Sequence, residues 1–387
     1  MPASPRTARA INDRLALRFL QEEGPLTAGQ LKERTGLSRP TVADLVERLT
    51  ASGLVAVVGE TGAQRRGPNA KLYGIVADRA HLAALDVRTE GVRLVVADLL
   101  GTVLAEASVP VAVGEETGAA VERAVALLER TAKEVGAGAL HTVGVGAPGL
   151  IDPATGELRD SSGLPLWHRR LIAALQERLP ARVLVENETN LAALAEQRDG
   201  ATRDRDTFVL LWLGLGIGAA VVLDGRLRRG ASGGTGEVGF LPVPGTGGVP
   251  SAVNCDGGFH SLAGSAAILE LAVEHGLVGP GEPVGRAAEV VRTAVASGAD
   301  GFLDVLADRV VLGAAAVVAV LDPGCVVLAG EVGRAGGDVL AERVAARLAL
   351  MSPLATEVRA GELGGGAVLR GALLMAREAA QDIVFAP

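Results

Sequence analysis

The chain has 387 residues, of which 49% are hydrophobic and 21% are charged. This composition is typical of a globular protein with two or three domains and excludes a disordered chain. Cys255 and Cys325 are the only cysteines, which excludes a disulfide framework and favours a reducing, cytoplasmic compartment. The longest apolar run, 310–321, falls short of the roughly 20 residues that a membrane-spanning helix needs. We therefore expect no membrane span, and the N-terminus lacks the apolar core of a secretory signal.

The net charge of −8 is unevenly distributed along the chain. Residues 1–80 carry 12 Lys and Arg against 8 Asp and Glu, whereas the remainder carries 25 against 37. Because an acidic surface repels nucleic acid, any DNA-binding part is expected within the first 80 residues. A local excess of this size can also be ordinary scatter, so charge alone does not assign a function.

Three helices are predicted in the first 50 residues. The first covers 12–22, and the second starts at Thr27, which has the capping-box spacing to Gln30 and is followed by a terminating Gly36. Ser38 can cap the third helix.

That third helix has one apolar stripe and one polar face. The stripe, at i, i+3, i+4 and i+7, is Val42, Leu45, Val46 and Leu49. The residues left facing outward are Arg39, Thr41, Asp44 and Arg48. Two short helices joined by a tight glycine turn are typical of a helix-turn-helix, whose second helix enters the major groove of DNA.

A predicted hairpin follows the helices. Strands are expected over 54–58 and 71–76, and the polar loop between them carries Arg65 and Arg66. The order of elements favours a winged helix-turn-helix over the alternative, a small helical interaction module with an incidental hairpin.

After residue 77 strands and helices alternate, which predicts a two-lobed α/β body. Strands are expected over 82–87, 92–98, 142–146, 183–186, 208–213, 219–223 and 326–329. Helices are expected over 119–135, 188–198, 262–275, 287–296, 302–320, 338–350 and 368–381.

Four motifs of this body, together with the winged helix, make the chain resemble the ROK family of sugar-responsive repressors and sugar kinases. They are VGVGAPGLID (143–152), VENETNLAALAE (185–196), LWLGLGIGAAVVLDGRLRRGASGGTGEVGF (211–240) and LDPGCVVLAGEVG (321–333). The resemblance implies an actin-like (ribonuclease H-like) ATPase-type body with a cleft between two lobes. It places a winged helix at 1–77, a first lobe at 78–200 completed by the C-terminal helix 368–387, and a second lobe at 201–367.

The resemblance also shows where this chain departs from the kinases. Their first hairpin has an Asp and a glycine-rich turn that approaches the ATP phosphates, whereas Asp86 is followed here by Val87, Arg88, Thr89 and Glu90. We interpret the ATP site as lost. The glycines 214, 216 and 218 formally match a dinucleotide fingerprint, but the residues after them predict a strand, not the required helix. An NAD enzyme is therefore disfavoured.

Two further motif positions concern sugar binding. Asn187-Glu188 stands where the family's kinases have Asn-Asp, the Asp being the general base, and the longer Glu misplaces the proton acceptor. Alternatively, Glu188 only favours the N-terminal dipole of its helix. The family's Gly-Glu-x-Gly-His keeps its Glu as Glu237 but has Phe240 for His, and Cys255 with His260 cannot complete a zinc site. No metal or cofactor is expected.

These features predict a non-enzymatic, DNA-binding transcriptional regulator, a repressor, that acts as a homodimer or higher homo-oligomer. The alternative is a ROK sugar kinase with an atypical active site. The residues expected to contact operator DNA are Ser38, Arg39, Thr41, Arg65 and Arg66. The residues expected to hold a sugar or sugar-derivative effector are Asn187, Glu188 and Glu237, unless Glu237 pairs with Arg228 or Arg229 in a vestigial cleft.

Overall fold

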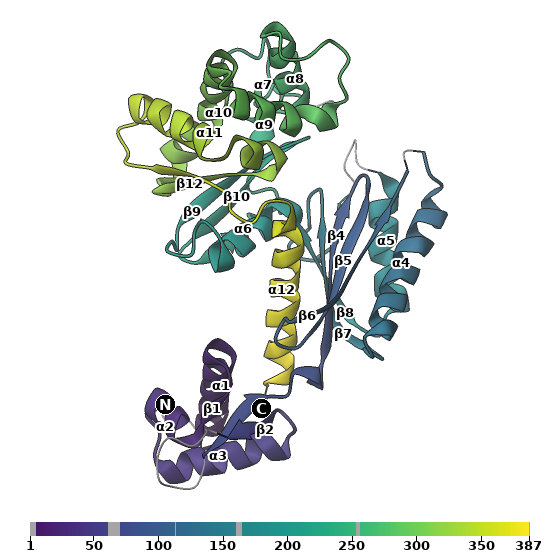
Figure 1. Ribbon diagram of the computed structural model, residues 1–387, viewed down its shortest axis with the longest axis vertical. Coiled ribbons are helices and arrows are strands. Elements are labelled where there is room, and N and C mark those ends of the chain that lie inside the picture. The colour runs from purple at the N-terminus through teal and green to yellow at the C-terminus, as the bar shows by residue number, and fades with distance from the viewer. Residues whose placement is uncertain (1–4, 61–69, 113, 160–164, 253–255, 387) are drawn as a thin grey trace.

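A computed structural model describes residues 5–60, 70–112, 114–159, 165–252 and 256–386. Figure 1 shows a small N-terminal domain at one end of an elongated molecule and two α/β lobes beyond it. Arg65, Arg66 and Cys255 lie outside the described residues. Among the described helices, none combines the length and the apolar character needed to cross a bilayer.

The N-terminal domain is a winged helix. Its elements are α1 (Pro5–Glu23), β1 (Leu26–Thr27), α2 (Ala28–Thr35), α3 (Arg39–Ala51), β2 (Val55–Glu60) and β3 (Lys71–Ile75). The Thr27 hydroxyl accepts from the Gln30 amide, while the Gln30 side chain accepts from the Thr27 amide, so the predicted capping box is confirmed. Gly36 ends α2 in the left-handed conformation, with φ of 70°. The predicted stripe of α3 is buried in full.

The first lobe is built on a five-stranded sheet of order β6-β5-β4-β7-β8. Its elements are β4 (His81–Arg88), β5 (Gly91–Asp98), β6 (Val103–Pro110), α4 (Thr117–Glu134), β7 (Leu140–Ala147), α5 (Leu166–Arg178), β8 (Arg182–Asn187) and α6 (Glu188–Asp199). Side chains of the strands alternate between two cores. Ala83 and Leu85 pack with α4 and α5, whereas Leu82 and Ala84 pack with the C-terminal helix α12 (Ala367–Val384).

The second lobe has a sheet of order β11-β10-β9-β12-β13. Its strands are β9 (Phe208–Leu213), β10 (Ile217–Leu223), β11 (Arg226–Arg228), β12 (Cys325–Ala329) and β13 (Glu357–Ala360). Its helices are α7 (His260–Ala263), α8 (Ser265–Glu274), α9 (Ala287–Ser297), α10 (Asp300–Leu321) and α11 (Gly330–Met351). These helices cover one face of the sheet, and α6 of the first lobe packs against the other face through Ala192, Ala193 and Ala195. The antiparallel β9–β10 pair contains the glycine turn, so strand–turn–strand is confirmed and the dinucleotide fingerprint is excluded there.

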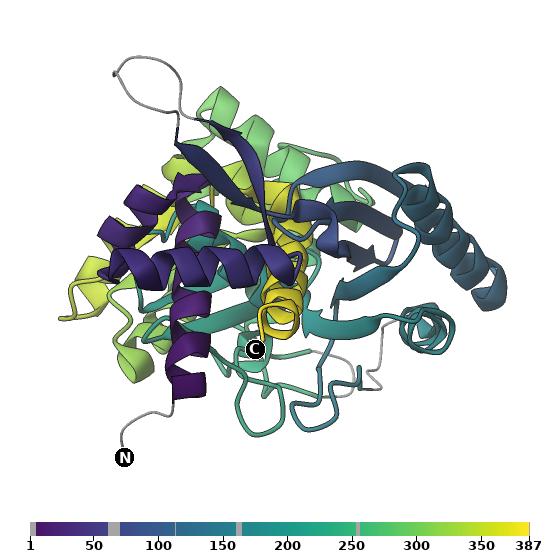
Figure 2. The same cartoon turned by 90° about the horizontal axis from the view of Figure 1, so that it is seen from below.

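Helix α12 connects the parts of the molecule. It begins between the lobes and runs along the first sheet to the winged helix, where the C-terminus lies (Figures 1 and 2). Phe385 belongs to the same buried core as Leu17 and Leu20 of α1. One core therefore extends from the winged helix through α12 to β4 and β5.

Some elements were not predicted, or were predicted with different bounds. Strands β1, β11 and β13 were not predicted because they are short, and β6 was not predicted because it exposes most of its residues. Helix α5 (Leu166–Arg178) was also missed, although its buried Trp167, Leu171 and Leu175 have helical spacing. The predicted helix 262–275 is two helices that meet at Gly264. The predicted helix 338–350 starts earlier, at Gly330, with a non-helical Gly337 inside it.

Candidate DNA interface and interlobe cleft

The start of α3 is exposed, and its hydroxyl groups are already engaged. Ser38 caps the helix by accepting from the Thr41 amide at 3.3 Å, and its hydroxyl lies 2.8 Å from that of Thr41. Arg39 is exposed and forms no ion pair or hydrogen bond with a described residue. Of these three predicted DNA contacts, Arg39 is therefore the side chain that is free to reach a base edge or a phosphate.

Arg48 was predicted to face outward, but the structure shows it tied down. Its guanidinium lies 2.5 Å from Asp13 of α1 and also pairs with Asp44, and its side chain is 30% exposed. These contacts raise the pKa of Arg48, since the neighbouring carboxylates stabilise its charge. Arg48 therefore connects α3 to α1 through an ion pair, so its role is structural.

The turn between β4 and β5 is filled by Arg88. Its guanidinium donates to Asp86 at 2.8 Å and to the Gly365 carbonyl at 3.2 Å, and it lies 3.6 Å from Glu331 at the start of α11. The Asp86 side chain is 1% exposed, and burial raises its pKa although Arg88 opposes this shift. Arg88 therefore contacts Asp86 in the first lobe and Glu331 in the second.

Glu331 fills the corresponding space at the glycine turn after β9. A Cβ at Gly214 would meet the Glu331 carboxylate, so a side chain there would require Glu331 to move. Burial raises the pKa of Glu331. A polyphosphate approaching Gly214 would meet this carboxylate. Sequence reasoning missed Glu331, although an acidic residue directly after Gly330 in the motif 321–333 was a visible signal.

Asn187 and Glu188 lie at the junction of β8 and α6. The Asn187 side chain accepts from the Thr189 amide at 2.9 Å and donates to the Gly149 carbonyl at 3.1 Å and to Glu188 at 2.7 Å. Its amide is thus used to cap α6 and to orient Glu188. Burial raises the pKa of Glu188 to about 8, and the charges of Glu237, Asp86 and Glu331 add to this shift.

Glu237 precedes the short helix Val238–Phe240 and faces solvent. The suggested pairing with Arg228 or Arg229 is wrong, because Arg228 lies 3.3 Å from Asp224 and Arg229 lies 2.5 Å from Glu186. Glu237 forms no hydrogen bond or ion pair with a described residue. Neighbouring protein atoms displace water and raise its pKa. Glu237 is therefore unpartnered among the described residues, and its charge adds to the raised pKa of Glu188.

The region expected to hold zinc in the resembling family offers few donors. His260 begins α7, and burial lowers its pKa. Within the described ranges, no group of three His, Cys, Asp or Glu side chains is placed to hold a metal ion.

Comparisons with known proteins agree with this architecture. The model of the ROK family matches residues 82–379, and that of the MarR family matches residues 11–67. A xylose repressor of Caldicellulosiruptor bescii is 25% identical over 61% of this chain, and the match spans 59% of that repressor. The chain thus covers less than two thirds of this relative.

Two solved structures are similar in fold. A ROK family transcriptional regulator, a homologue of the Escherichia coli Mlc protein, superposes with a TM-score of 0.76 at 21% identity and 98% coverage of both chains. A ROK hexokinase from Thermus thermophilus gives a TM-score of 0.61 at 27% identity, covering 78% of this chain and 99% of the hexokinase. The match to the regulator extends over the winged helix of this chain, whereas the match to the hexokinase covers a shorter part of the chain.

Proposed function

Because the chain belongs to the ROK family, whose model spans residues 82–379, we propose that it is a DNA-binding transcriptional repressor with a non-catalytic, sugar-kinase-like sensor body. One observation carries this proposal. A winged helix with a free Arg39 is joined to a body in which Arg88 lies beside the turn after β4 and Glu331 lies beside the glycine turn after β9. Such a regulator acts in the cytoplasm, where its operator lies.

The filled turns support a sensor that does not transfer phosphate. Catalysis of phosphoryl transfer depends on positioning and on groups that stabilise negative charge. Glu331 adds negative charge at Gly214, and the buried Asp86 is neutralised by Arg88 instead of being free for another partner. The body can then bind an effector without catalysing phosphoryl transfer.

The DNA function is tested by selecting ligands for the full-length protein from a pool of randomised duplexes. We expect enrichment of a two-fold symmetric site, because the proposed homodimer presents two copies of α3 to successive major grooves. Arg65 and Arg66 are proposed to contact the same operator through the wing. Failure to enrich any sequence, with binding that stays non-specific at every salt concentration, would contradict the proposal.

The effector is proposed to bind between the lobes through Glu188 and Glu237, with Asn187 as the residue that orients Glu188. Carboxylates accept charge-assisted hydrogen bonds from hydroxyl groups, which suits a sugar or a sugar derivative. Calorimetry with a panel of neutral sugars tests this for the parent, for Glu237→Ala and for the control Glu129→Ala on α4. Equal affinity in the parent and in Glu237→Ala would remove Glu237 from the site.

A sugar kinase is the second candidate, and one observation favours it. Burial gives the Glu188 carboxyl a pKa of about 8, which suits a general base near neutral pH. A coupled assay with ATP and common hexoses separates the two functions. Turnover that Glu188→Gln abolishes would establish an enzyme, whereas rates at background support the sensor.

Separate cores support a division into 1–77, 78–200 with 368–387, and 201–367. The second lobe has its own large core, and one face of the first sheet has another. The winged helix, in contrast, shares a core with α12 and the other face of that sheet. We therefore propose that the winged helix and first lobe move together.

A further inference from the structure

The loop 229–237 belongs to the second lobe, and Glu237 is its last residue. Both ends of the loop are fixed to the second sheet. It begins directly after β11, and near its other end the Gly236 carbonyl accepts from the Ala219 amide of β10 at 2.7 Å. Gly236 approaches β10 so closely that a Cβ there would collide with the Ala219 carbonyl. The position of Glu237 therefore depends on how this loop is held.

Arg229 anchors the start of the loop to the first lobe. Its Nε lies 2.5 Å from Glu186 of β8, whose side chain is 4% exposed. The other carboxylate oxygen of Glu186 accepts from the Asn187 amide and from the Asn190 side chain, both at 2.9 Å. One buried carboxylate therefore connects the second lobe to Asn187, the residue that orients Glu188.

Gly233 brings the middle of the same loop against the first lobe. It has a φ of 82°, and a Cβ at this position would collide with the Ile151 carbonyl oxygen, so the close approach requires glycine. The segment 149–151 is in turn bound to β8, because the Asn187 side chain donates to the Gly149 carbonyl at 3.1 Å. The loop is thus held on the first lobe at two points, which are Arg229 and Gly233.

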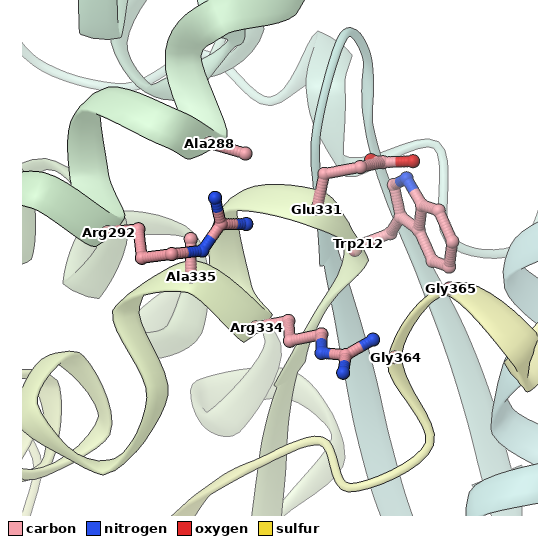
Figure 3. A pocket seen from close by; sticks show the side chains of 9 residues that line it. Trp212, Ala288, Arg292, Glu331, Arg334, Ala335, Gly364 and Gly365 are labelled. Atoms are coloured by element: carbon pink, nitrogen blue, oxygen red, sulfur yellow. The ribbon is translucent and has the colours of Figure 1, made fainter.

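This contact is separate from the one between Arg88 of the first lobe and Glu331 of the second, which lie 3.6 Å apart. Figure 3 shows Glu331 beside Trp212, on the wall of a cavity of about 480 Å³. No residue of the loop 229–237, all of which is described, lines that cavity. Of these two contacts between the lobes, the one made by Arg229 therefore acts on the loop that carries Glu237.

The neighbouring Arg228 provides an internal comparison. The side chains of Arg228 and Arg229 are 45% and 46% exposed. Arg228 lies 3.3 Å from Asp224 and donates to the Leu223 carbonyl at 3.2 Å, so its partners belong to its own lobe. Two adjacent arginines of equal exposure thus differ in one respect, because Arg229 alone of the two pairs with the first lobe.

We propose that Arg229 and Glu186 are positioning residues of the effector site, because their ion pair holds the loop 229–237 on the first lobe and so sets where Glu237 lies relative to Glu188. This inference rests on the proposed function, since it concerns the proposed effector site between the lobes. When the lobes separate, the ion pair breaks and Glu237 moves away with the second lobe. The site is complete only while the lobes are in contact, so an effector bound there favours that arrangement.

Urea unfolding of the full-length, ligand-free protein at pH 9 tests this positioning. The charge of Glu237 raises the pKa of Glu188, and such an interaction falls with distance. In the parent we expect the effects of Glu188→Gln and Glu237→Gln on stability to be non-additive, because removing either charge relieves the other. We expect this non-additivity to disappear in an Arg229→Gln background, to return with Arg229→Lys, which keeps the positive charge, and to be unchanged in the control Arg228→Gln.

Amide hydrogen exchange locates the effect in the chain. Exchange in the loop 229–237 is expected to rise several-fold in Arg229→Gln and to stay at the parent rate in Arg228→Gln. Gly233→Ala is the second variant, because it displaces the loop from Ile151 while every charge stays in place. It should also abolish the non-additivity, and it replaces Arg229→Gln in the test if that variant, which leaves Glu186 without its cation, does not fold.

Three results would overturn the inference: additive effects in the parent, non-additivity that persists when Arg229 is replaced by Gln or Gly233 by Ala, or an equal loss in Arg228→Gln. None of these measurements uses a sugar or DNA. Persistent non-additivity in a protein that binds a sugar through Glu237 refutes the positioning role alone. The expected loss of non-additivity in a protein that binds no sugar refutes the proposed effector site alone.

Discussion

Arg88 occupies a turn that would be open with a small residue, and it compensates the Asp86 carboxylate beneath it. Asp86 is almost completely buried, so its charge depends mainly on the Arg88 guanidinium at 2.8 Å, with a smaller contribution from Arg93. Removing one partner of a buried ion pair costs more than the pair contributes, because the other charge is left uncompensated. Arg88 is therefore also needed for the stability of the first lobe, because it compensates the charge of Asp86.

Arg88→Ala is expected to destabilise the protein by about 3–5 kcal/mol, the usual cost of leaving one member of a buried pair uncompensated. The double variant Arg88→Ala/Asp86→Asn should recover most of this loss, since no unpaired charge remains. Urea unfolding of the parent, both single variants and the double variant gives the coupling between the two residues. Additive effects in this cycle would contradict the compensation of Asp86 by Arg88.

Glu188 gives the protein a specific pH dependence. Its folded pKa of about 8 lies above the ordinary value of 4.5, so the folded state binds its proton more tightly than the unfolded state does. Between these values stability falls as pH rises, and above pH 8 the full cost of ionising the buried carboxyl is present.

Glu188→Gln removes this cost while keeping an oxygen that can accept from Asn187. We expect the variant to be more stable than the parent at pH 8, by a few kcal/mol, and to differ little from it at pH 4.5. Denaturant unfolding at both pH values provides the comparison, with Glu129→Gln on α4 as the matched control. A stability difference that does not change with pH would show that Glu188 does not titrate in this range.

At the scale of elements, local signals predicted local structure. The caps of α2 and α3 and the buried stripe of α3 could be read from spacing, because each depends on residues within two helical turns. The edge strands β6, β11 and β13 could not, because their pairing depends on distant neighbours and not on their own pattern. The same limit applies to the site. Glu188 and Glu237 could be identified as motif positions. The contact between Arg88 and Glu331 could not be predicted, because these residues belong to different lobes and are far apart in the sequence.

Two arginines of α3 have different predicted roles: Arg39 contacts operator DNA, whereas Arg48 stabilises the fold. Arg39→Ala is expected to weaken operator binding by roughly 1–3 kcal/mol with little effect on stability, because this side chain has no protein partner. Arg48→Ala is expected to lower stability, because it breaks the link to Asp13. Fluorescence anisotropy with the selected operator and thermal unfolding of both variants give the two readouts. The assignment would be contradicted if Arg48→Ala changed operator affinity without changing stability, and Arg39→Ala left operator affinity unchanged.

At the scale of the whole molecule, α12 is the physical connection between the lobes and the winged helix. At its N-terminal end, the Gly365 carbonyl accepts from Arg88 and from Arg93 at 3.2 and 3.1 Å. At its C-terminal end, Gln381 donates to the Leu99 carbonyl at 2.9 Å, and Asp382 pairs with Arg14 of α1. A change in lobe spacing that moves the Gly365 turn can therefore be passed to α1 along a packed helix.

The double variant Arg88→Ala/Arg93→Ala removes both donors to Gly365 and should loosen this connection at its origin. We expect amide hydrogen exchange to rise several-fold at the start of α12 and, to a smaller extent, in α1, because local opening propagates through the shared core of Phe385, Leu17 and Leu20. Exchange in α9 and α10 of the second lobe serves as the internal reference, and Arg130→Ala is the control variant. Faster exchange limited to β4 and β5, with α12 and α1 unchanged, would mean that α12 does not couple the cleft to the winged helix.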